Sequence, residues 1–271
     1  MISSLAALVL LAVLAGFWLL SVFVRDASII DVFWGPGFAL VAGVCAATRG
    51  TALDPWRMLL LVMVTVWGLR LGLYLARRNL SREHLAARDG SGEDRRYQAM
   101  RARIGPRFWL ISLGTVFALQ GCLLFVVSLP IQTALLGTTE ISGLRLAPAI
   151  IGVALWAVGL LFEAVGDAQL ARFKADPANA GQVMDRGLWR YTRHPNYFGD
   201  FLIWWGHFAV AAALGAPWWT AVGPVIMSIL LTRVSGVPLL ERDLRKRRAG
   251  YEEYVRRTSA FFPRPPRSES N

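Results

Sequence analysis

Seven apolar stretches, separated by polar segments, divide the chain. They cover residues 3–24, 28–47, 58–76, 108–129, 146–166, 200–214 and 220–235. A helix needs about 20 apolar residues to cross a bilayer, and most of these stretches come close to that length. The pattern predicts an all-α, polytopic membrane bundle with about seven transmembrane helices. The sixth stretch is short, so six crossings is the alternative.

The polar segments between these stretches differ strongly in charge. Segments 77–107 and 167–200 and the tail after 236 fall on one side of a seven-helix bundle and hold most of the basic residues. The other side holds Arg49, Arg57 and Arg145. Since basic loops stay in the cytoplasm, the C-terminus is expected there and the N-terminus outside. We expect 77–107, 130–145 and 168–193 to be polar connections, with a surface helix near Tyr97.

Composition supports a membrane protein of one domain. Of 271 residues, 55% are hydrophobic and 17% charged, outside the usual range of soluble domains. The net charge of +11 is explained by cytoplasmic loops, so no nucleic acid partner is expected. The two cysteines lie in apolar stretches, and no spacing suggests a metal site. Residues 1–271 are interpreted as a single membrane domain. Its 1–129 half would hold a substrate cavity, and its 130–271 half a cofactor motif.

The most specific polar motif is residues 187–200, which read GLWRYTRHPNYFGD. Two arginines alternate there with aromatic residues between two apolar stretches. Guanidinium groups bind phosphate oxygens with two donors, and both arginine and aromatic faces stack on flat rings. The motif therefore suits an anionic ligand that carries rings. The plainer interpretation is a basic cytoplasmic loop with aromatic residues at the membrane interface.

Ionisable residues inside apolar stretches form a second group of candidates. Asp31 lies near the start of the second stretch, and Arg70 and Tyr74 lie near the end of the third. Ionisable groups within a membrane are costly and mark functional sites by default. Arg70 and Tyr74 are the expected partners of Asp31. The alternative is an Asp31–Arg70 pair that only fixes helix packing.

Several segments together resemble a known membrane superfamily. Residues 187–199, Glu241 and residues 251–263 resemble the C-terminal half shared by steroid 5α-reductases, sterol reductases and isoprenylcysteine carboxyl methyltransferases. Residues 31–35 and 67–71 resemble the bacterial steroid 5α-reductase-like proteins of the DUF1295 family. With that family the resemblance covers most of the chain, and it implies an integral protein of the bacterial inner membrane.

The resemblance implies NADPH as the cofactor and assigns residues to it. Glu163, Asp167 and Lys174 match nucleotide-contacting positions of the reductases, Asn196, Tyr191 and Asp200 match those of the next motif, and Asp31 is the counterpart of a substrate-holding glutamate. The full set of cofactor candidates is Glu163, Asp167, Arg172, Lys174, Arg190, Tyr191, Arg193, His194, Asn196, Tyr197, Asp200, Glu241 and Arg245. The catalytic candidates are Asp31, Arg70 and Tyr74.

The expected reaction is NADPH-dependent reduction of a carbon–carbon double bond conjugated to a carbonyl in an apolar lipid. Asp31, kept neutral by apolar surroundings, would donate a hydrogen bond to the carbonyl oxygen. If Asp31 is instead paired with Arg70, then Arg70 or Tyr74 would polarise that oxygen. The alternatives are a methyltransferase of the isoprenylcysteine type that uses S-adenosylmethionine, and a non-catalytic lipid-binding protein. The sequence leaves the lipid and the oligomeric state open.

Overall fold

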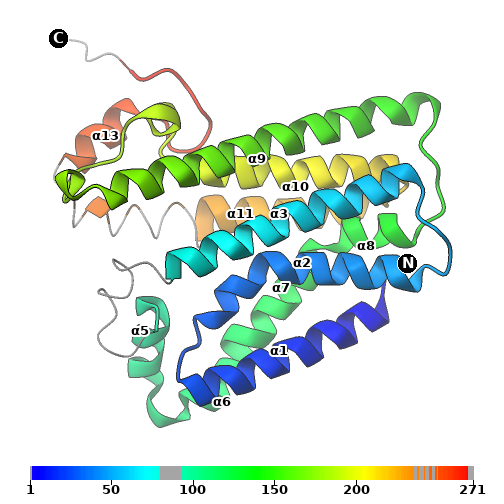
Figure 1. The fold of residues 1–271 in the computed structure, drawn as a ribbon, viewed down its shortest axis with the longest axis horizontal. Helices are drawn as coiled ribbons and strands as arrows, with labels where there is room; N and C mark the ends of the chain where they lie inside the picture. Colours follow the sequence, from blue (N-terminus) through cyan, green and yellow to red (C-terminus); the bar gives the residue numbers. More distant parts are fainter. Residues whose placement is uncertain are drawn as a thin grey trace. The chain divides into compact units, whose positions relative to one another are not determined.

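The chain is a bundle of helices that suits a membrane. A computed structural model describes residues 2–79, 93–234, 237, 241, 244–245, 248 and 250–267, and every regular element among them is helical (Figure 1). Five helical segments are long and apolar enough to cross a bilayer. They are Ser4–Val24, Ile29–Thr48, Pro55–Asn79, Arg95–Val127 and Gly143–Ala175. The predicted all-α membrane bundle is confirmed, and the count of seven crossings stays a prediction.

The chain separates into two compact units. The first comprises residues 1–142 and 211–220, and the second comprises residues 143–210 and 221–271. Helices of the first unit are α1 (Ser4–Val24), α2 (Ile29–Thr48), α3 (Pro55–Asn79), α5 (Arg95–Ile104), α6 (Phe108–Ser112), η2 (Leu113–Ala118), α7 (Leu119–Val127) and α8 (Leu129–Leu136). Helix α2 lies against α1, α3, α7 and α8, so it is the centre of this unit.

Small residues let α2 and α3 pack backbone against backbone. A Cβ added to Gly35 would lie 2.3 Å from the Gly68 carbonyl oxygen, and one added to Gly72 would lie 2.6 Å from the Pro36 ring. Real side chains do not approach so closely, so glycine is required at both positions. The Gly35–Pro36–Gly37 interruption therefore belongs to the packing of α2 against its neighbours.

Helix α8 corrects the expectation that residues 130–145 form a loop. The sequence pattern missed it because eight residues are too few to cross a membrane. Buried Arg57 donates to the carbonyls of Ala134 and Thr139 at 2.9 Å each, and Arg49 donates to the Leu135 carbonyl at 2.9 Å. Carbonyls in the last turn of a helix lack partners within the helix. The two arginines satisfy carbonyls at the end of α8 and hold it in the unit.

The second unit contains η3 (Gly143–Arg145), α9 (Leu146–Ala175), η4 (Pro177–Asn179), η5 (Gly187–Arg190), most of α10 (Pro195–Ala213), α11 (Val222–Ile229), η7 (Leu230–Val234) and α13 (Tyr251–Arg257). Helix α9 continues to Ala175, well past the expected end at 166. Helix α10 begins at Pro195 instead of 200, with a proline at its first position, where no backbone donor is lost. The predicted polar segment 168–193 is therefore partly helical.

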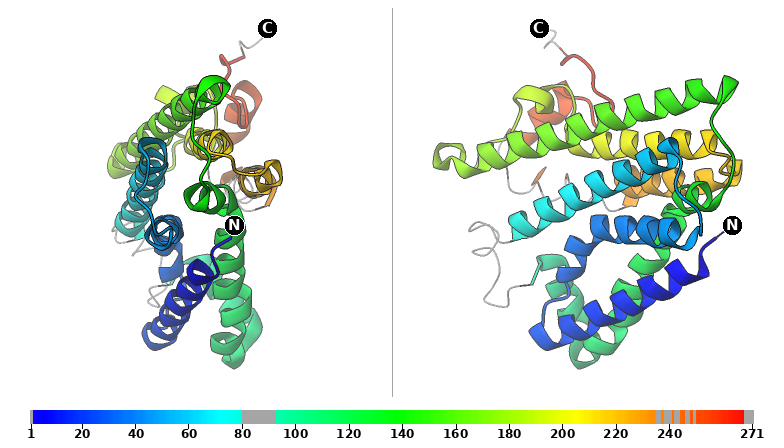
Figure 2. Two further views of the ribbon diagram at one scale, coloured as in Figure 1. Left: turned by 90° about the vertical axis from the view of Figure 1, so that its right-hand side faces the viewer. Right: turned by 45° about the vertical axis from the view of Figure 1, so that its right-hand side comes forward.

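Glycines seven residues apart fix α9 against α10, which run side by side in Figure 2. A Cβ on Gly159 would lie 2.5 Å from the Gly199 carbonyl oxygen, and one on Gly152 would lie 2.8 Å from that of Gly206. Seven residues are about two helical turns, so these glycines share one face of each helix. This close contact sets the end of α9 beside the start of α10, where most of the cofactor candidates lie.

Candidate functional site

Within the second unit, hydrogen bonds hold the loop between α9 and α10 against α9 and α13. Gly187 has φ +59°, which favours glycine, and the Leu188 N–H donates to Gln169 Oε1 at 3.0 Å. The buried Trp189 donates its indole N–H to the Gly166 carbonyl at 3.0 Å, and its own carbonyl accepts the Tyr254 hydroxyl. Trp189 thus joins α9 to α13 and gives the loop a fixed conformation.

Arg193 is used to hold the C-terminal tail. Its backbone N–H donates to the Ser259 carbonyl at 2.9 Å, and its guanidinium donates to the Thr258 carbonyl at 2.6 Å and to Glu241 Oε1 at 2.8 Å. The side chain is 8% exposed. The sequence placed Arg193 among the phosphate ligands, but the structure places most of its donors on protein oxygens.

His194 shares the Glu241 carboxylate with Arg193. Its Nε2 lies 3.1 Å from Glu241 Oε1, and its ring stacks on Tyr197 at 5.5 Å between ring centres. Burial lowers the pKa of His194, and the carboxylate of Glu241 only partly opposes this, so the imidazole is neutral at pH 7. Burial opposes the ionisation of Glu241, but hydrogen bonds from His194 and Arg193 outweigh it and lower its pKa to about 2.

Two buried carboxylates of α9 face the start of α10. Glu163 and Asp167 are one turn apart, and both are 3% exposed. Asn196 donates its side-chain amide to Asp167 Oδ1 at 3.1 Å. Gly166 lets Pro195 pack closely against α9. A Cβ added to Gly166 would lie 3.2 Å from the proline ring. The structure therefore brings together Asp167 and Asn196, which the sequence assigned to one site.

The remaining cofactor candidates of the second unit differ in how exposed they are. Arg172 and Lys174 are exposed in the last turns of α9, and Arg190 and Tyr191 are exposed in the loop. Tyr197 and Asp200 are half-buried in the first turns of α10. Exposed Arg245 pairs with Glu252 at 2.8 Å and lies 4.0 Å from Glu241. None of these cofactor roles is tested by the contacts, so they stay predictions.

Asp31, in the first unit, has partners that the sequence did not suggest. Its Oδ2 accepts from Arg96 at 2.6 Å, and its Oδ1 accepts from the Tyr97 hydroxyl at 2.7 Å. Gln120 donates to the same hydroxyl at 3.2 Å. Both carboxylate oxygens accept hydrogen bonds, one of them in an ion pair. The expectation that Arg70 and Tyr74 are the partners of Asp31 is therefore corrected, and its catalytic role stays a prediction.

Arg70 and Tyr74, the expected partners of Asp31, contact each other. The Arg70 guanidinium lies 5.6 Å from the centre of the Tyr74 ring. The sequence suggested them because all three residues lie within about two turns of the same end of the bundle, and α2 and α3 do pack together. The groups that reach Asp31 come instead from α5, which lies within the polar segment 77–107. Their catalytic roles stay predictions.

Tyr97, Arg96 and Gln120 are the candidates that sequence analysis missed. Tyr97 is 6% exposed, although it lies in a helix of mostly polar residues. A tyrosine between charged residues is expected at the surface. Its contact with Asp31 spans 66 positions, so local sequence does not indicate it. One signal was present: the expected surface helix placed Tyr97 at the same end of the bundle as Asp31.

Comparison with known proteins gives one match. A family described as "Protein of unknown function (DUF1295)" matches residues 17–258, which is most of the chain. No curated protein and no solved structure matches.

Proposed function

Because the chain belongs to the DUF1295 family, whose function is unknown, we propose its activity from the residues themselves. The proposal is an NADPH-dependent reductase, similar to the steroid 5α-reductases, that acts on a double bond conjugated to a carbonyl in an apolar lipid. The observation that carries it is the Asp31–Tyr97–Gln120 cluster. It places an oriented hydroxyl next to a charged arginine where side chains of α2, α5 and α7 meet.

Tyr97 is the proposed carbonyl-binding residue. The Tyr97 hydroxyl donates a hydrogen bond to the Asp31 carboxylate, and the Gln120 side-chain amide donates one to the hydroxyl oxygen. The hydroxyl is therefore held in one orientation. A substrate carbonyl that replaces Asp31 as the acceptor would be polarised by this hydroxyl. Arg96, whose guanidinium is held by Asp31, would stabilise the negative charge that develops on the oxygen. Asp31 positions the Tyr97 hydroxyl until the carbonyl takes its place, and continues to position Arg96.

Residues of the second unit fit a dinucleotide by the chemistry of their side chains. Arg172, Lys174 and Arg190 are exposed cations that suit phosphate oxygens, and Asn196 carries an amide that is fixed by Asp167. The phosphates and the nicotinamide carboxamide of NADPH would find complementary donors and acceptors among these side chains. When bound, NADPH supplies a hydride to the β-carbon of the substrate, and a proton from solvent completes the reduction at the α-carbon.

A methyltransferase that uses S-adenosylmethionine is the second candidate. The observation in its favour is the Arg193–Glu241–His194 cluster, since the arginine, histidine and downstream glutamate are the residues that the chain shares with the isoprenylcysteine methyltransferases. The cluster holds the tail against the loop and needs no dinucleotide. The two buried acids of α9 and the cluster at Asp31 have no assigned role in that reaction, which is why we prefer the reductase.

Ligand-induced stabilisation separates the two candidates. NADPH at a hundred times its Kd should raise the stability of the purified protein by about 2.7 kcal/mol, while S-adenosylmethionine should have no effect. Asn196→Ala should reduce the NADPH effect, and Gln182→Ala, an exposed loop substitution, should leave it unchanged. Stabilisation by S-adenosylmethionine alone would favour the methyltransferase, and no response to either would favour a non-catalytic protein.

A further inference from the structure

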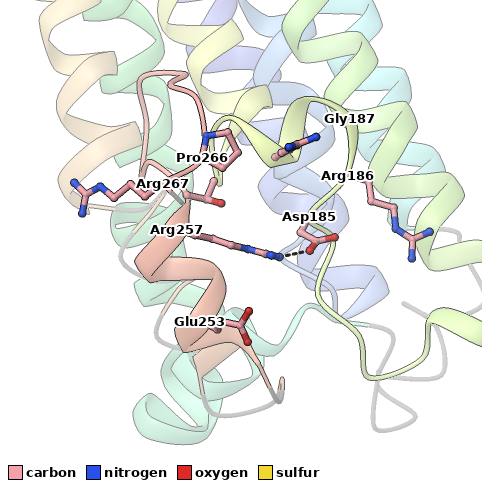
Figure 3. A pocket seen from close by; sticks show the side chains of 9 residues that line it. Asp185, Arg186, Gly187, Glu253, Arg257, Pro266 and Arg267 are labelled. Atoms are coloured by element: carbon pink, nitrogen blue, oxygen red, sulfur yellow. Dashed lines mark hydrogen bonds and ion pairs between the residues drawn. The ribbon is translucent and has the colours of Figure 1, made fainter. Parts of the chain in front are cut away.

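An arginine-lined hollow lies on the second unit, between the loop at 185–190 and the tail. Its volume is about 590 Å³, within the range of small-molecule sites. We call it the arginine hollow, and Figure 3 shows most of its lining. The lining residues that carry charge are Asp185, Arg186, Arg190, Glu253, Arg257 and Arg267. Four arginines face two acids, so the hollow has a net positive charge.

The backbone around the arginine hollow is held by hydrogen bonds. The Arg267 N–H donates to the Arg257 carbonyl at 2.9 Å, and the Arg264 N–H donates to the Tyr191 carbonyl at 2.9 Å. On the opposite wall, the loop is fixed through Gly187 and Trp189, as described above. The backbone of both walls is therefore held in place.

The arginines of the hollow differ in how far they are neutralised. Arg257 forms an ion pair with Asp185 across the hollow. In Figure 3, Arg186 and Arg267 extend to opposite sides of that pair. Both are exposed, and no ion pair with either is found in the part of the chain that the structure describes. Two uncompensated cations thus flank one compensated pair, and their charges favour an anion between the two walls.

The positive surface continues into a second hollow of about 460 Å³. It shares Arg257, Thr258 and Arg267 with the first and adds Arg193, Arg256 and Arg264, and no acid is found among the described residues of its lining. Phe262, two residues before Arg264, is 54% exposed. An exposed aromatic residue among arginines is typical of segments that contact lipid headgroups.

We propose that the arginine hollow binds a phosphate or diphosphate group. The proposal goes beyond the reductase function, because Arg186, Arg257 and Arg267 are not among the cofactor candidates; Arg190, which also lines the hollow, is one and is left unchanged in the test. Trp189, bonded to Gly166 on one side and to Tyr254 on the other, lies between the hollow and the Asp167–Asn196 contact. The phosphate could belong to a soluble compound or to an anionic phospholipid, since both present the same oxygens to arginine.

The test compares two double variants of the full-length protein. Arg186→Gln with Arg267→Gln removes two cations from the hollow. Arg103→Gln with Arg107→Gln removes two exposed cations of the first unit and serves as the charge-matched control. Inorganic pyrophosphate is titrated at low salt in an uncharged detergent, and thermal stability reports its binding. In parallel, each protein is placed in nanodiscs of phosphatidylcholine with phosphatidylglycerol, and retained lipid is measured by native mass spectrometry.

The hollow variant should bind pyrophosphate at least tenfold more weakly than wild type and the control, or retain less phosphatidylglycerol, or both. A change with pyrophosphate alone identifies a soluble phosphate compound, and a change with lipid alone identifies a headgroup. If the hollow variant and the control behave alike in both assays, the proposal is wrong. Stabilisation by NADPH should persist in the hollow variant, so failure here is distinct from failure of the proposed function.

Discussion

Arg193 shows how one residue can be read in two ways. Its position between aromatic residues suggested a phosphate ligand, yet its guanidinium lies against Glu241 and the Thr258 carbonyl. A buried charge is stable only when it is paired and hydrogen-bonded, and Arg193 meets both conditions within the protein. Its contacts fix the tail beside the loop that carries Arg190 and Tyr191.

The Glu241 carboxylate should make stability depend on pH. The pKa of Glu241 falls from 4.5 to about 2 in the folded protein, so it binds protons less readily than in the unfolded chain. Its stabilising effect is therefore complete above pH 4.5 and is lost as the pH falls towards 2. Glu241→Gln should cost about 3 kcal/mol at pH 7, because it leaves Arg193 buried without its counter-charge.

Thermal unfolding in detergent between pH 2 and pH 7 checks this prediction. The difference in unfolding temperature between wild type and Glu241→Gln should shrink as the pH falls from 4.5 to 2. The control is Glu252→Gln, which removes the exposed partner of Arg245 and should have little effect. A Glu241→Gln protein as stable as wild type at pH 7 would contradict the account.

Individual site residues could be predicted only where local sequence carries the signal. Asp31, Asp167 and Asn196 stand out because a polar side chain in or beside an apolar stretch is costly. The partner of Asp31 could not be found in this way, because Tyr97 lies 66 positions away and its position depends on where α5 packs. The sequence left open whether Asp31 pairs with an arginine, and it did not identify Arg96 as that arginine.

At the scale of the helices, glycine spacing decides how closely the site residues meet. Gly152, Gly159 and Gly166 on α9 and Gly199 and Gly206 on α10 all repeat every seven residues. Their backbones touch, which keeps Glu163 and Asp167 next to the first turns of α10. Apolar length could be read from the sequence, and most helices were found that way. The end of α9 and the whole of α8 were missed because their residues are too polar or too few to register as a membrane crossing.

Gly159→Val should disrupt the contact between α9 and α10. The new Cβ would lie 2.5 Å from the Gly199 carbonyl oxygen and 2.9 Å from Ile203, with backbone on one side that cannot give way. Overpacking of this kind typically costs 1–3 kcal/mol, and we expect about 3 kcal/mol here. Gly43→Ala, with nothing within 4 Å of its Cβ, is the control and should be neutral or slightly stabilising. Equal thermal stability of the two variants would show that the close contact is unimportant.

At the scale of the whole molecule, the number of membrane crossings fixes which side each polar segment occupies. Five segments satisfy length and hydropathy by themselves. Helix α10 has polar first turns, and the apolar segment Trp218–Val234 is shorter than the five. If both cross, the total is seven and the termini lie on opposite faces, with the basic segments in the cytoplasm.

Reporter fusions test this topology. A reporter that is active only in the cytoplasm should work when fused after Asn271 and fail when inserted next to Arg145. A second reporter, active only outside, should give the reverse pattern. Cytoplasmic activity at both positions would rule out the seven-crossing arrangement.

The most direct test of the central claim is the oxidation of NADPH by the purified protein, followed by absorbance in the presence of an enone lipid. The account predicts oxidation that depends on the lipid, and a loss of about 100-fold in kcat for Tyr97→Phe, because one donor to the developing oxyanion is removed. The control Thr115→Val removes an exposed hydroxyl of the same unit, and its kcat should equal that of the wild type. No lipid-dependent oxidation across steroid, isoprenoid and fatty acyl enones, or full activity of Tyr97→Phe, would contradict it.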